Sequence, residues 1–167
     1  ALDAGAMPAL APGVWIGAGL RLGGFFEVGL EGRFLPEQRA RLAPRPQVGA
    51  DVSMLAGRLR LGAGFVVLED RVVAFELAPL IAVELGAVSA NAVGLMTPLS
   101  SSSLWWAFDV GMELRAFFFD ALGVFVRGEA QITLRRAAFF VEGYTTPVFR
   151  ASDAGFVGLI GVLFRTS

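Results

Sequence analysis

The 167-residue sequence contains no cysteine, no histidine and no lysine, so all 14 of its basic residues are arginine. These absences exclude disulfides, thiol nucleophiles, Cys/His zinc sites and every acid–base mechanism that needs an imidazole. Charge is also scarce, at 17% of residues against about 25% in an average soluble domain. The 14 basic and 15 acidic residues nearly cancel, so nothing indicates a nucleic-acid surface. We expect no cofactor, no metal site and no nucleic-acid partner.

Hydrophobic residues make up 55% of the sequence, yet it lacks the runs of about 18–20 apolar residues that transmembrane helices need. The longest uncharged stretch, Leu85–Phe108, is interrupted by Asn91, Thr97, Pro98 and Ser100–Ser103. The 21 glycines and 8 prolines, spread along the chain, also argue against long helices. The length predicts a single domain, residues 1–167.

Apolar residues instead alternate with small or charged residues, which is the pattern of β-strands with two unlike faces. In one segment, Val28 and Leu30 share a face while Glu27 and Glu31 lie on the other. Residues 1–8 are a fainter candidate for an eighth strand. The seven clear segments are Val14–Leu22, Phe25–Leu35, Leu55–Val67, Val73–Leu85, Trp106–Phe118, Val124–Arg135 and Ala154–Phe164.

Short and long connections alternate between these segments. The short ones are Leu22–Gly24, Leu68–Arg71 and Phe119–Gly123, and the long ones are Pro36–Pro46, Gly86–Ser103 and Arg136–Ser152. Short turns at one rim and long loops at the other are typical of outer-membrane barrels. We therefore predict an all-β fold, a transmembrane up-and-down antiparallel β-barrel of eight strands with short periplasmic turns and long extracellular loops. An even number of strands would place both termini at the rim with the short turns.

The same alternation could build a soluble ligand-binding barrel with its apolar face inside. Against this, the charged faces are rich in glycine and alanine, and aromatic residues gather near both ends of the strands, as a bilayer selects. A lipid-facing arginine at the bilayer midplane costs about 2–4 kcal/mol, so the arginines should point inward. The aromatic residues are Phe25, Phe65, Phe75, Phe117–Phe119, Phe125 and Phe164 at one end, and Trp15, Phe34, Trp105, Trp106, Phe139, Phe140 and Phe156 at the other.

The polar faces carry seven arginines and seven acids, which predicts a lumen filled by arginine–carboxylate pairs. An eight-stranded barrel is just wide enough for side chains to fill it, and the planar guanidinium binds carboxylates with two parallel hydrogen bonds. Equal numbers of both signs favour a plugged lumen over a selective pore. The predicted network comprises Arg21, Glu27, Glu31, Arg33, Arg58, Arg60, Glu76, Glu84, Asp109, Glu113, Arg115, Arg127, Glu129 and Arg135.

These patterns make the chain similar to the small outer-membrane β-barrels of Gram-negative bacteria, of the OmpX type and the OmpA transmembrane-domain type. The resemblance covers Val14–Phe164 and rests on alternation, loop asymmetry, aromatic ends and the last strand GFVGLIGVLF. It implies integral localisation in a bacterial outer membrane, in contact with lipid and lipopolysaccharide. Barrels of this kind often end on an aromatic residue that their insertion machinery reads; here Arg165–Ser167 follow Phe164.

Outside the strands, two sets of residues suggest binding. Arg39, Arg41 and Arg45 in the loop Pro36–Pro46 could bind lipopolysaccharide phosphates, although a solvated loop is the alternative. The other long loops are apolar for a surface, which favours a protein partner, unless the strands continue beyond the membrane and these residues pack together. The residues of this partner surface are Leu95, Met96, Leu99, Phe140, Tyr144, Val148 and Phe149.

We find no catalytic site in the sequence. Ser100–Ser103 has no base to activate a nucleophile, and the pairs Glu27/Glu31 and Asp109/Glu113 are interpreted as structural because arginines lie near them. We predict a non-enzymatic outer-membrane barrel that serves as a membrane anchor, an accessory subunit of an envelope assembly or a surface interaction protein. The alternatives are a narrow outer-membrane pore, an enzyme acting on envelope lipids and a soluble ligand-binding barrel.

Overall fold

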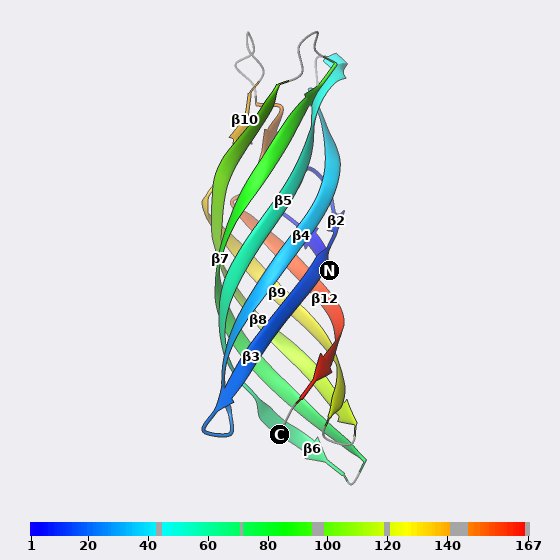
Figure 1. Cartoon of the computed structure of the whole chain (residues 1–167), viewed down its shortest axis with the longest axis vertical. Helices are drawn as coiled ribbons and strands as arrows, with labels where there is room; N and C mark the ends of the chain where they lie inside the picture. The colour runs from blue at the N-terminus through cyan, green and yellow to red at the C-terminus, as the bar shows by residue number, and fades with distance from the viewer. Residues whose placement is uncertain (43–44, 71, 95–98, 119–120, 141–146, 166–167) are drawn as a thin grey trace.

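The computed structural model of the chain describes residues 1–42, 45–70, 72–94, 99–118, 121–140 and 147–165, and for Leu42, Arg45 and Pro46 it describes the backbone alone. These residues form an all-β structure, as predicted, in which seven long strands wind around one interior (Figure 1). No helix in the described part is long and apolar enough to span a membrane. The long strands are β3 (Val14–Leu22), β4 (Phe26–Leu42), β5 (Arg45–Ala63), β7 (Val73–Val93), β8 (Ser100–Phe118), β9 (Leu122–Arg135) and β12 (Ala154–Phe164).

Five short strands complete the twelve that are assigned in the described residues. The main sheet has the order β2-β1-β12-β9-β8-β7-β5-β4-β3, with β6 also paired to β7, and all its pairs are antiparallel. The ends that carry the β3–β4, β6–β7 and β8–β9 connections form the turn end of the molecule, and the opposite rim is the loop end. The short strands are β1 (Leu2–Ala4), β2 (Ala11–Pro12), β6 (Phe65–Glu69), β10 (Ala138–Phe139) and β11 (Phe149–Arg150).

The sheet is curled like a barrel but is not closed, which differs from the predicted eight-stranded closed barrel. Ordered by hydrogen bonding, it begins at β3 and ends at β12 with the small β1–β2 hairpin attached. Seven long strands are an odd number, so the two edge strands β3 and β12 run in the same direction. The predicted eighth strand, residues 1–8, forms only the three residues of β1, and Ala1 lies midway along the molecule instead of at the turn end (Figure 1).

Two of the predicted long loops are largely strand. β4 and β5 extend through most of Pro36–Pro46, and β7 and β8 pair from Ala87 opposite Leu104 up to Asn91 opposite Ser100. The alternation that defines these strands lower down fades here. Alanine, glycine and serine replace the large apolar residues in β7 and β8, and charged and polar residues replace them in β4. The predicted strands Val14–Leu22 and Ala154–Phe164 match β3 and β12.

Side chains alternate between the two faces of every long strand, with charge inside and apolar groups outside near the turn end. In β7, Glu84 is fully buried while its neighbours Val83 and Leu85 are about half exposed on the outer face. The aromatic residues divide between these faces. Phe34, Phe75, Trp106, Phe156 and Phe164 are exposed, whereas Trp15, Trp105, Phe117, Phe125 and Phe139 are buried or half-buried.

Candidate functional site

The interior near the turn end holds a network of arginine–carboxylate pairs that crosses from one wall to the other. Arg21 on β3 reaches Glu76 on β7 at 2.6 Å, and Arg115 on β8 reaches Glu27 on β4 at 2.5 Å. Arg21 also contacts Glu27 at 2.6 Å, so these two acids and two arginines form one connected group. The Arg21–Glu76 and Arg115–Glu27 contacts join strands that are not neighbours in the sheet.

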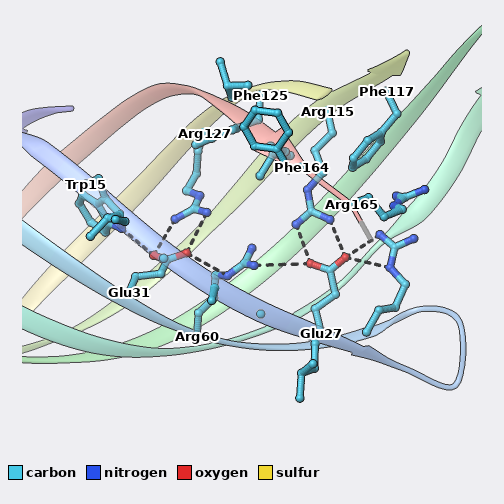
Figure 2. Close-up of a pocket in the computed structure, with 18 residues that line it drawn as sticks. Trp15, Glu27, Glu31, Arg60, Arg115, Phe117, Phe125, Arg127, Phe164 and Arg165 are labelled. Atoms are coloured by element: carbon cyan, nitrogen blue, oxygen red, sulfur yellow. Dashed lines mark hydrogen bonds and ion pairs between the residues drawn. The ribbon is translucent and has the colours of Figure 1, made fainter. Parts of the chain in front are cut away.

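A second group lies next to the first, around Glu31 of β4. Arg127 of β9 donates two hydrogen bonds to its carboxylate, at 2.9 and 3.0 Å, and Arg60 of β5 approaches it to 3.1 Å (Figure 2). The indole Nε1 of Trp15 donates to the same carboxylate at 2.8 Å. Arg127 and Arg115 both also bond to Glu113, which links the two groups.

Toward the loop end, two further arginines bind acids in full burial. Arg58 donates two hydrogen bonds to Glu129 across the interior, at 2.6 and 2.8 Å. Arg33 lies between Asp3 at 2.6 Å and Glu84 at 2.7 Å, and these side chains are about 1% exposed. Removing one member of such a buried pair leaves an uncompensated buried charge, so breaking a pair strongly destabilises the fold.

Of the fourteen residues predicted for this network, all but Arg135 lie in it. Arg135 is exposed at the upper end of β9. Asp109 is its least engaged member, with Arg58 at 3.7 Å and no hydrogen bond to its carboxylate oxygens among the described residues.

Two charged members of the network are not among the residues predicted from the sequence. Asp3 belongs to β1, where the alternation is faint, and its carboxylate accepts bonds from Arg33 and from the N–H of Ala6. Arg165 follows the last strand and contacts Glu76 at 2.6 Å. The signal that could have located Asp3 is its place between Leu2 and Ala4, because neighbouring residues in a strand point to opposite faces.

A cavity of about 610 Å³ opens into the network on one side of the molecule. Its rim is formed by β3 from Trp15 to Arg21 and by the end of β12 from Val162 to Phe164. The charged floor includes Glu27, Glu31 and Arg60, which Figure 2 shows between the two rims. We call the gap between β3 and the Leu159–Phe164 half of β12 the seam.

The loop end of the interior is different, because it is apolar. Leu35, Val52, Met54, Val88 and Trp105 are completely or almost completely buried there. The outer face changes in the opposite sense, since Ser53, Ser89 and Ser102 lie side by side in register on the outer surface. Along the same strands, the arrangement therefore switches from charged inside and apolar outside to apolar inside and polar outside.

The arginines predicted to contact lipopolysaccharide lie in this loop-end region. Arg39 is half exposed, but its guanidinium is engaged by Asp51 through two hydrogen bonds of 2.7 Å. These bonds and the positive charge of Arg39 hold the pKa of Asp51 below its ordinary value. Arg41 is exposed. The side chain of Arg45 lies outside the described part of the structure.

Of the predicted partner surface, the residues that the structure describes do not share one exposed patch. Leu99 and Phe140 are exposed, whereas Val148 and Phe149 are buried. The rings of Phe149 and Phe139 are stacked, with their centroids 6.3 Å apart. Leu95, Met96 and Tyr144 lie outside the described residues. For Val148 and Phe149 the structure thus gives the alternative reading, in which extended strands pack these side chains together.

The network offers little for chemistry on a substrate. The carboxylates Glu27, Glu31 and Glu113 are bound by guanidinium groups, so their oxygens are already engaged and are not free to take a proton from a substrate. The described residues contain no cluster of three or more acidic side chains placed to hold a metal ion.

No protein-family model matches the chain, and neither the curated proteins nor the solved structures contain a match to it.

Proposed function

We propose that this chain is an integral outer-membrane β-barrel with a charge-plugged lumen, and that its role is non-enzymatic: a membrane anchor, an accessory subunit of an envelope assembly or a surface interaction protein. The observation that carries the proposal is the switch of polarity along the strands. Near the turn end the outer surface is made of large apolar side chains, and toward the loop end it becomes polar.

Water is a poor environment for the outer face near the turn end. Ile16, Leu20 and Ile160 are between 73% and 80% exposed, and burying one such side chain fully gains about 1.5–3 kcal/mol. Soluble monomers rarely expose continuous apolar patches beyond a few hundred Å². Hydrocarbon accepts this surface without cost. The serine row and the exposed Arg39 and Arg41 fit the water above the membrane, so the boundary falls near Phe34 and Trp106.

Membrane residence is tested by expressing the chain with an export signal and extracting the membranes with alkaline carbonate. The proposal expects the protein to stay in the outer-membrane fraction and to need detergent for release. Recovery of folded protein in the aqueous phase without detergent would overturn it and favour the soluble barrel.

The plugged lumen is tested separately. The proposal takes cross-wall pairs such as Arg58–Glu129 and Arg115–Glu27 to block the axis. We expect no steady conductance of nanosiemens order after reconstitution into planar bilayers. Such a conductance would replace the plugged lumen by the pore, while leaving membrane residence untouched.

A further inference from the structure

The two edges of the seam have no strand partner on the side where they face each other. In the described residues β3 pairs only with β4, and the Leu159–Phe164 half of β12 pairs only with β9. Their remaining N–H and C=O groups point into the gap. Edge strands are a template for pairing with another chain, because each carries a row of unpaired N–H and C=O groups.

The edges cannot close on each other within this antiparallel sheet. β3 and β12 run in the same direction, so an antiparallel ladder needs one further strand between them that runs the opposite way. β1 already occupies this place at the upper end of the seam. Leu2 and Asp3 pair with Gly158 and Val157 of β12 on one side, and with Pro12 and Ala11 of β2 on the other.

The register of β1 can be extended backwards from Ala1. The amino group of Ala1 donates to the carbonyl of Gly13 at 3.0 Å, and the N–H of Gly13 donates back to Ala1 at 2.9 Å. One step further, a residue ahead of Ala1 lies opposite Val14 and Ile160, and the fifth such residue lies opposite Ala18 and Phe164. The two edges, β3 and β12, therefore assign the same register to one continuous strand between them.

We propose that the seam is a docking groove for one extended polypeptide strand that leads into Ala1 and runs antiparallel to both β3 and β12. This strand would give the sheet its eighth wall and would cover the cavity. The Ala1 amide would make the bond to Gly13 that its ammonium group makes now. The inference rests on strand register alone, and it stands or falls separately from membrane residence.

The neighbours of the groove specify the side chains of the strand. Its first, third and fifth residues, counted back from Ala1, share the outer face with Val14, Ile16 and Ile160, and should be apolar. The second and fourth share the inner face with Gly161 and Gly17. Directly beside these two glycines there is little room, because a Cβ at Gly17 would lie 2.6 Å from Cγ of Glu31 and one at Gly161 would lie 2.5 Å from the Phe125 ring. The inward residues should be small.

The test adds the segment Ala-Val-Gly-Leu-Ala-Val directly ahead of Ala1 in the full 167-residue chain. The reversed segment, Val-Ala-Leu-Gly-Val-Ala, has the same composition but turns its large residues inward, and serves as the matched control. Because the chain has no cysteine, a cysteine in place of the third residue counted back from Ala1 can be paired with Ile16→Cys or Val162→Cys for disulfide formation.

We expect the first segment to form a disulfide with both Ile16→Cys and Val162→Cys, and not with Ile160→Cys, two residues out of register. It should also raise the urea midpoint of unfolding, whereas the reversed segment should do neither. The proposal is overturned if neither edge cross-links, or if both segments behave alike. A disulfide between Ile16→Cys and Val162→Cys in the chain without an added strand would also overturn it, because the edges would then close directly.

Discussion

The two ends of the interior solve the same packing problem with opposite chemistry. Near the turn end, Arg60 and Glu31 fill the space with paired charges. Near the loop end, Met54 and Trp105 fill it with apolar side chains. β5 carries both solutions, since Met54 and Arg58 are four residues apart on the same inner face. On the proposed membrane placement, the difference teaches that the medium around each end, and not strand geometry, decides which residues face inward.

The largest expected effect on stability comes from a substitution that leaves a buried charge without its partner. We expect Arg58→Met to destabilise the fold by about 3–5 kcal/mol, because Glu129 would lose both of its hydrogen bonds in full burial. The measurement is the free energy of unfolding by urea in detergent micelles. The control is Arg135→Gln on the exposed end of β9, which should change it by less than about 0.5 kcal/mol. Equal effects of the two substitutions would contradict the network.

A second pair of variants locates the switch on the outer face of a single strand. Val83 and Ser89 both point outward from β7, on opposite sides of the proposed membrane boundary. In lipid bilayers, Val83→Arg should cost about 2–4 kcal/mol because the charge would lie in hydrocarbon. Ser89→Arg should be nearly neutral, because its side chain would reach water. If Ser89→Arg is as costly as Val83→Arg, the boundary is placed wrongly.

The smallest expected effect concerns the loop-end arginines and sharpens the contrast between bound and available guanidinium groups. Arg39 is held by Asp51, so Asp51→Asn should free it and raise the lipopolysaccharide that co-purifies with the protein. Replacing Arg39, Arg41 and Arg45 together by glutamine should lower that amount. Unchanged lipid content in both variants would count against the contact.

The same pair has a defined pH dependence. Its contribution to stability is present above the unfolded-state pKa of Asp51 and is lost as the pH falls through the lowered folded-state pKa. Acidification should therefore release Arg39 in the manner of Asp51→Asn, and the variant itself should show no such response.

Much of the turn-end half could be predicted from the sequence. There the outer residues are large and apolar and the inner ones charged, so alternation places β3 and β12 and orients Arg21, Glu27 and their partners. Alternation identifies a strand only where its two faces carry residues of different polarity. After Phe34 in β4, charged and polar residues on both faces remove this contrast, and before Leu104 in β8 Ser100–Ser103 remove it, so these strand segments look like loops in the sequence.

Other features could not be found in this way because they depend on the whole assembly. The burial of Trp105 against the exposure of Trp106 follows from register, whereas composition alone suggests an aromatic rim for both. The open seam is a property of strand number and direction. Alternation in β3 or β12 alone does not reveal which edge lacks a partner.

Trp105 and Trp106 also provide the most direct test of the central claim that the apolar outer face meets hydrocarbon. Trp105 is fully buried and Trp106 is 40% exposed on the outer face. Variants that retain one tryptophan each, with phenylalanine at the other two positions, can be reconstituted in vesicles whose acyl chains carry bromine. The account predicts strong quenching of Trp106 fluorescence and little quenching of Trp105. Equal quenching, or quenching of Trp105 alone, would contradict it.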